Sequence, residues 1–169
     1  MEGSSRRGHG KYKSEEGSLM KLSIHSDEHY MREALKQALL AAEEGEIPVG
    51  AVVVADNRII ARAHNQTERL CDPTAHAEML ALTAATNYLG TKYLSDCSLY
   101  VTLEPCGMCA GALYWSQLGK LIYAAEDDRR GFTVINPSMI HPKTEVLRGP
   151  FAQEAGDLVS TFFKGLRGK

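Results

Sequence analysis

Four residues near the middle of the chain are of the types that bind a metal ion and move protons. His76 and Glu78 stand two positions apart, and Cys106 and Cys109 form a Cys-x-x-Cys step that begins thirty positions after His76. One imidazole and two thiolates make three protein ligands, and a zinc site of this kind keeps its fourth position open for water. The sequence therefore predicts a catalytic site with one Zn²⁺ per subunit, held by His76, Cys106 and Cys109.

Glu78 is predicted to carry the proton, because it could reach a water on that metal without being a ligand itself. Zinc lowers the pKa of bound water toward neutrality, and a neighbouring carboxylate can pass the proton to a substrate and its leaving amine. Either half of the pattern is common alone, since a Cys-x-x-Cys can also be redox-active or structural. A non-catalytic, zinc-stabilised binding module remains a hypothesis, with Cys71 as its one credible fourth ligand.

The elements that must position these residues alternate between helix and strand. Apolar periodicity predicts helices at residues 27–44, 75–88 and 107–117, a closing amphipathic helix around residues 158–166, and strands at residues 49–54, 58–63, 98–103, 120–125 and 144–147. The first two strands form a hairpin, and the rest of residues 127–150 is predicted to be loop. This order predicts an α/β fold, a three-layer α/β/α sandwich with a central mixed five-stranded sheet.

Composition bounds the kind of protein. A chain of 169 residues suits a single domain, which we place at residues 20–169, and residues 1–19 are predicted to be a disordered tail or an added extension. A net charge of −2 excludes a uniformly basic nucleic-acid binder but leaves room for a local basic patch. No apolar run approaches the roughly 20 residues that span a bilayer, and no secretory signal is evident, so we expect a cytoplasmic protein without a membrane partner.

Three segments carry a resemblance to a known family. Residues 47–52 read Ile-Pro-Val-Gly-Ala-Val, residues 72–78 contain the His-x-Glu step, and residues 99–112 contain Pro-Cys-x-x-Cys. The last two together are the known signature of zinc deaminases. The chain resembles the bacterial tRNA adenosine deaminases, within the cytidine/deoxycytidylate deaminase superfamily, over most of residues 27–127.

The resemblance implies a fold, a reaction and an assembly. It implies a cytidine-deaminase-like fold and a homodimer that hydrolyses a C–N bond, converting adenosine to inosine at the wobble position of a tRNA anticodon. His76, Cys106 and Cys109 match the zinc ligands of the family, and Glu78 matches its proton shuttle.

Further residues match the substrate side of the family. Asn65 matches a residue that hydrogen-bonds the purine, although an Asn at the end of a strand also suits a turn. The backbone of Ala77 would lie beside the base. The candidates for contacts with the RNA backbone are basic residues in two clusters, Arg129 and Arg130, and Lys164 and Arg167.

The substrate has a competing interpretation. After Tyr123 the family usually shows Gly-Ala-x-Asp, whereas residues 124–127 read Ala-Ala-Glu-Asp, and Tyr114-Trp115 is closer to the guanine deaminases of the same superfamily. A deaminase of a free base or nucleoside, guanine or cytosine, is therefore the alternative. The loop after Asp127 is expected to decide between the two substrates.

Overall fold

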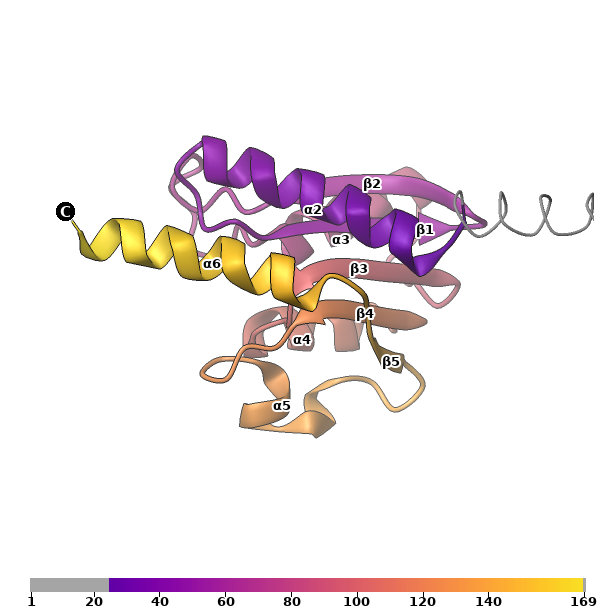
Figure 1. Ribbon diagram of the computed structural model, residues 1–169. Coiled ribbons are helices and arrows are strands. Elements are labelled where there is room, and N and C mark those ends of the chain that lie inside the picture. The colour runs from indigo at the N-terminus through magenta and orange to yellow at the C-terminus, as the bar shows by residue number, and fades with distance from the viewer. Residues whose placement is uncertain (1–24, 169) are drawn as a thin grey trace, which may run out of the picture.

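The computed structural model describes residues 25–168, in which five strands form one mixed sheet (Figure 1). The strand order is β2-β1-β3-β4-β5. β1 pairs antiparallel with β2 and β3, while β3, β4 and β5 run parallel. The strands are β1 (Gly50–Ala55), β2 (Arg58–His64), β3 (Cys97–Leu103), β4 (Lys120–Ala125) and β5 (Glu145–Arg148). The predicted mixed five-stranded sheet is thus confirmed, and the predicted tail at residues 1–19 lies outside the described residues.

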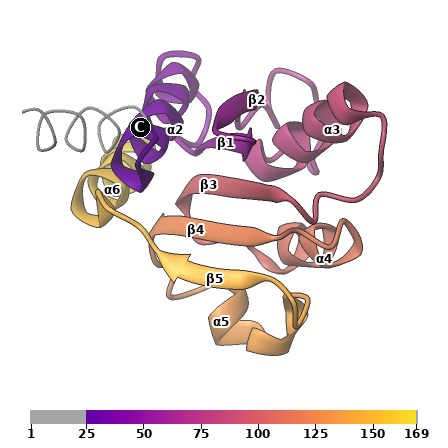
Figure 2. The ribbon, with the colours of Figure 1, turned by 90° about the vertical axis from the view of Figure 1, so that its right-hand side faces the viewer.

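Helices cover both faces of the sheet (Figure 2). α2 (Asp27–Glu43) and α6 (Ala152–Arg167) lie on one face, and α3 (Ala77–Leu89) and α4 (Gly107–Trp115) lie on the other. The short helices α5 (Phe132–Ile135) and η1 (Pro137–Met139) precede β5. The three layers predicted from the sequence are present, and within the described residues no helix is long and apolar enough to cross a membrane.

β1 contains no polar side chain, in keeping with the packing of helices against both of its faces. In β1, Ala51 and Val53 belong to the core under α3 and α4, and Val52 and Val54 belong to the core under α2 and α6. A strand buried on both sides reads as a continuous apolar run rather than an alternating one. Gly50 is required at the start of this strand, because a Cβ there would overlap the Ala34 carbonyl oxygen of α2.

Three element boundaries differ from the sequence-based prediction by two or more residues. α3 begins at Ala77 rather than at residue 75, since His76 has an extended backbone and is the N-cap. α4 ends at Trp115 because Gln117, which was predicted to be helical, has a positive φ of 51°. α6 begins at Ala152, well before residue 158, because its first three residues are exposed and show no apolar periodicity.

Candidate active site

The candidate metal ligands come from the N-termini of two neighbouring helices. His76 is the N-cap of α3, Cys106 is the N-cap of α4, and Cys109 lies in the first turn of α4. Neither side chain makes an N-capping hydrogen bond, and the two side chains face each other. Helix N-termini carry partial positive charge, which stabilises thiolates there.

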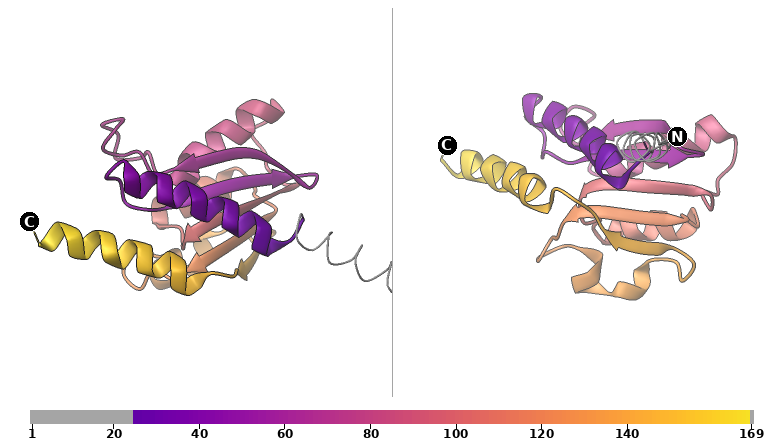
Figure 3. Two further views of the ribbon diagram at one scale, coloured as in Figure 1. Left: turned by 45° about the horizontal axis from the view of Figure 1, so that its top comes forward. Right: turned by 45° about the vertical axis from the view of Figure 1, so that its right-hand side comes forward.

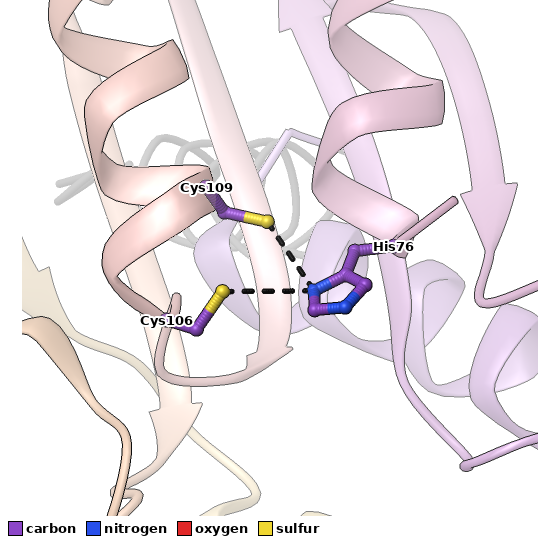
Figure 4. Close-up of side chains that lie close together, drawn as sticks. All are labelled: His76, Cys106 and Cys109. Atoms are coloured by element: carbon purple, nitrogen blue, oxygen red, sulfur yellow. Dashed lines mark hydrogen bonds between the residues drawn. The ribbon is translucent and has the colours of Figure 1, made fainter. Parts of the chain in front are cut away.

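The three side chains converge on a common point (Figure 4). The Nδ1 atom of His76 lies 3.6 Å from the Cys106 sulfur and 3.5 Å from the Cys109 sulfur. One ligand atom from each residue lies within 4.8 Å of the other two. Zinc prefers imidazole nitrogen and cysteine sulfur as ligands, so this donor set fits the ion, with Nδ1 as the donor of His76.

The pKa values of the two cysteine thiols are shifted in opposite directions. A hydrogen bond from the Cys109 thiol, with a second contact to His76, lowers the pKa of Cys106 to about 4. The same hydrogen bond, together with burial, raises the pKa of Cys109. The lowered pKa of Cys106 favours its thiolate, which is the form that binds a metal.

Glu78 lies in the first turn of α3, two residues beyond His76, and is only 5% exposed. Burial, the largest effect, raises its pKa to about 6, and the neighbouring Cys106 adds to the rise. A carboxyl group with a pKa near neutrality can both accept and return a proton at pH 7. The carboxyl group of Glu78 thus lies next to the three candidate ligands, where it can serve as both acid and base without being a ligand itself.

The predicted substrate residues lie at the same end of the fold. Asn65 directly follows β2 and is 4% exposed. The N–H of Gln66 donates to the carbonyl oxygen of Ala75 at 3.0 Å, which brings Asn65 beside the segment that leads into His76. Ala77, the first residue of α3, is fully buried.

The predicted RNA contacts are divided between two places. Arg129 and Arg130 are exposed in a turn whose two main-chain N–H groups donate to Asp127 Oδ1, both at 3.0 Å. This turn adjoins the metal loop through a β-bridge between Gly131 and Cys106. The exposed Lys164 and Arg167 instead lie in the last turn of α6, whose C-terminal end extends past the sheet (Figure 3).

Two buried carboxylates beside the site were not singled out from the sequence. Glu104 is 3% exposed, and its Oε2 accepts from the main-chain N–H of Thr133 at 3.1 Å and from its hydroxyl at 2.9 Å. Glu46 is 1% exposed and accepts from the loop after β2. Each stands one or two positions before a proline, but no feature of the sequence distinguishes them from other acidic residues, because their partners lie in distant loops.

Comparison with known proteins decides the family. Residues 24–125 match the family described as the cytidine and deoxycytidylate deaminase zinc-binding region. The chain belongs to this deaminase family. It is 46% identical over 145 residues to a tRNA-specific adenosine deaminase of Aquifex aeolicus, covering 83% of the chain and 95% of the relative. The predicted family membership and the predicted hydrolysis of a C–N bond are confirmed.

Solved structures of deaminases are also similar to this chain. A structure from studies of A-to-I editing by tRNA:A34 deaminases at the wobble position is 39% identical, with a TM-score of 0.72, and the match covers 77% of this chain and 98% of that one. The Bacillus subtilis guanine deaminase is 44% identical with a TM-score of 0.56, but the match covers 59% of this chain and 64% of that one. Similarity to the tRNA:A34 structure therefore extends over nearly that entire chain, while similarity to the guanine deaminase is partial.

Proposed function

We propose that the deaminase converts adenosine to inosine at the wobble position of tRNA. The observation that carries this proposal is the 46% identity to a tRNA-specific adenosine deaminase over 95% of that relative. In the proposed reaction, water replaces the 6-amino group of the base: a C–O bond forms at C6, the C6–N bond breaks, and ammonia leaves.

In this proposal His76, Cys106 and Cys109 would bind the zinc ion, and Glu78 would transfer the protons. When bound, zinc supplies a water molecule that is acidic enough to be a nucleophile near pH 7. Glu78 takes one proton from the attacking water and gives it to the purine ring, then takes the second proton of that water and gives it to the departing amine. Its burial keeps this proton away from bulk water, and its pKa of about 6 allows both transfers.

Asn65 and Ala77 form the substrate side of the proposed site. Asn65 presents its amide at the end of β2, and we assign it to the purine, with the main chain of Ala77 beside the base. Ala77 is the first residue of α3, where a helix leaves its main-chain N–H groups without partners inside the helix. These main-chain N–H groups could donate hydrogen bonds to acceptor atoms on the edge of the purine ring.

The proposed RNA surface is local, because the chain as a whole has a net charge of −2. Arg129 and Arg130 are exposed next to the metal loop, where phosphates flanking a flipped-out adenosine would pass. Lys164 and Arg167 on α6 would extend this contact along the anticodon stem. We also place the protein in the cytoplasm, where a tRNA substrate would be found. We regard residues 20–169 as a single domain.

We further propose that the deaminase is a homodimer, joined through the groove between α3 and α4. Trp115 is 79% exposed at this groove and lies next to Tyr114, and Tyr93 also lines the groove. Lys92 is the one formally charged side chain among the residues that line it within residues 25–168. A neutral, aromatic surface suits a second copy of the same surface better than it suits RNA phosphates.

The substrate proposal is tested by comparing RNA with free compounds. Zinc-loaded protein is incubated with an anticodon stem-loop bearing adenosine at position 34, and separately with adenine, adenosine, guanine, cytosine and cytidine, while ammonia release is measured. Glu78→Gln protein provides the background. Ammonia from the stem-loop alone supports the proposal, whereas ammonia from guanine or cytosine alone contradicts it.

A further inference from the structure

Glu46 is a buried carboxylate that the proposed reaction does not use. It follows α2, and its side chain receives four hydrogen bonds from the loop after β2 while remaining 1% exposed. Oε1 accepts from the main-chain N–H of Arg69 at 2.7 Å. Oε2 accepts from the N–H of Glu68 at 3.2 Å, and from Asn65 Nδ2 and Thr67 Oγ1 at 3.5 Å each.

The main-chain contacts decide the role of each carboxylate oxygen. A main-chain N–H can only donate, and one such group faces each oxygen of Glu46. Glu46 is therefore an acceptor at both oxygens. The amide of Asn65 must then turn its NH₂ group toward Glu46 and its Oδ1 away, because the opposite orientation would bring two acceptor oxygens together.

Further contacts, in addition to those of Glu46, hold the main chain that carries Asn65. The N–H of Asn65 donates to the carbonyl oxygen of Val49 at 3.1 Å, and Gln66 is bonded to Ala75, one residue before His76. Glu46 adds hydrogen bonds from the N–H groups of Glu68 and Arg69 and from the Asn65 amide, so it holds the loop and orients that amide without belonging to the cluster of candidate metal ligands.

We propose that Glu46 is a positioning residue that sets which edge of the Asn65 amide reads the substrate base. This inference rests on the proposed function to the extent that Asn65 contacts the base. Glu46 acts through Asn65 and does not touch the substrate, so its replacement changes base recognition while the metal site remains occupied.

Two variants separate the polarity of Glu46 from its shape. Glu46→Gln keeps the shape but introduces an NH₂ group, which allows the Asn65 amide to turn over. Glu46→Asp keeps both acceptor oxygens and shortens the side chain. If polarity is what matters, Glu46→Gln loses more base recognition than Glu46→Asp, and if shape matters, the order is reversed.

The experiment measures the contribution of the base to binding. In a Glu78→Gln background, which prevents turnover, the Kd of the position-34 adenosine stem-loop is compared with that of the same RNA lacking the base at position 34. The Kd of the RNA without the base is divided by the Kd of the adenosine RNA, and this ratio is determined for Asn65→Ala, for Glu46→Gln, for Glu46→Asp and for the Asn65→Ala/Glu46→Gln pair. Glu44→Gln is the matched control, since Glu44 lies two positions away and contacts Arg69 and His64 from the exposed side. Zinc content is measured for every protein.

We expect Glu46→Gln and Asn65→Ala each to reduce this ratio about tenfold, with unchanged zinc content and little further loss in the pair. Such non-additivity is the mark of residues that act as one unit. Equal losses for Glu46→Gln in the presence and absence of Asn65, or a larger loss for Glu46→Asp, would overturn the inference. If Glu46→Gln does not fold, loss of the ratio in Glu46→Asp overturns it and retention supports it. Failure of the proposed function gives a different result, because the wild-type protein would then be inactive on the stem-loop. The same variants would in that case be compared on the base that the wild-type protein deaminates.

Discussion

At the scale of single residues, the site of this deaminase depends on where two helices begin. His76 and Cys106 are both N-caps in extended conformation, and this lets the imidazole and the thiolate meet outside the helices rather than point along them. The residue types and their spacing were enough to predict the three candidate ligands and Glu78. The choice of Nδ1 on His76 and the order of the two thiol pKa values could not be predicted, because both depend on how the helix ends face each other.

Replacing Glu78 separates proton transfer from metal binding. In Glu78→Gln protein we expect turnover to fall about 100-fold or more, because no carboxyl group remains to carry the proton, while zinc content and Tm stay close to those of the wild type. Stopped-time inosine assays and metal analysis measure the two effects. Activity near the wild-type level in this variant would contradict the assigned role.

The two kinds of cysteine respond differently to substitution. Cys106→Ser removes a sulfur that lies 3.6 Å from His76 Nδ1, and we expect the bound zinc per subunit to fall well below one. Cys71→Ser is the control, because Cys71 is exposed, donates to the Glu68 carbonyl oxygen, and lies outside the ligand cluster. Metal analysis after gel filtration gives the stoichiometry, and equal zinc in Cys106→Ser and wild type would mean that the ligand assignment is wrong.

At the scale of elements, the loop that follows β4 is fastened to the metal loop at several points. Glu104, just before Pro105 and Cys106, accepts two hydrogen bonds from Thr133 at the start of α5, and the N–H of Phe132 donates to the Pro105 carbonyl oxygen at 2.9 Å. The loop that carries Arg129 and Arg130 is therefore held in a fixed position beside the site.

Gly131 is the residue that makes this fastening possible. A Cβ at this position would overlap the Glu104 carboxylate, so we expect Gly131→Ala to lower the free energy of unfolding by about 1–3 kcal/mol and to reduce activity as well. Gly111→Ala in α4 is the control, because a Cβ there meets no atom within 4 Å. Urea unfolding measures both, and equal stability of the two variants would show that the loop is not fastened in this way.

The elements also show how far the sequence could be interpreted. The strand at residues 120–125 was predicted with the bounds that the structure gives, and the helix α2 to within one residue, because long apolar patterns define both. α5 was missed since four residues are too few to show helical periodicity. Glu46 and Glu104 were missed because their partners are main-chain N–H groups of distant loops, and such contacts leave no pattern in the sequence.

At the scale of the whole molecule, the two proposed binding surfaces lie on different parts of the protein. The proposed RNA contacts at Arg129 and Arg130 adjoin the metal loop, whereas the aromatic groove with Trp115 lies farther along α3 and α4. One surface can therefore bind RNA while the other binds a second subunit. The net charge of −2 predicted that any RNA surface is local but could not show where it lies.

The salt dependence of RNA binding tests the arginine pair. In Arg129→Gln/Arg130→Gln protein we expect weaker binding of the stem-loop, and a slope of log K against log salt reduced by about 0.7 for each phosphate that an arginine no longer neutralises. Arg32→Gln/Lys36→Gln is the control, because both residues are exposed on α2 and paired with acidic neighbours. An unchanged slope in the first variant would remove Arg129 and Arg130 from the RNA surface.

The oligomeric state tests the aromatic groove. Trp115→Glu places a charge on its most exposed aromatic side chain, and we expect the protein to become monomeric at micromolar concentration because burying that charge is costly. Leu39→Glu, an exposed site on α2 across the sheet, should leave the dimer intact. Light scattering after gel filtration measures both masses, and a dimeric Trp115→Glu protein would contradict an interface at this groove.

The central claim is tested most directly by locating the modified base in an intact tRNA. The zinc-loaded protein is incubated with a tRNA transcript that has adenosine at position 34, and the product is digested and mapped by mass spectrometry. The account predicts inosine at position 34 and unmodified adenosine elsewhere in the transcript, with none formed by Glu78→Gln protein. Unmodified adenosine at position 34, together with rapid deamination of free guanine, would contradict it.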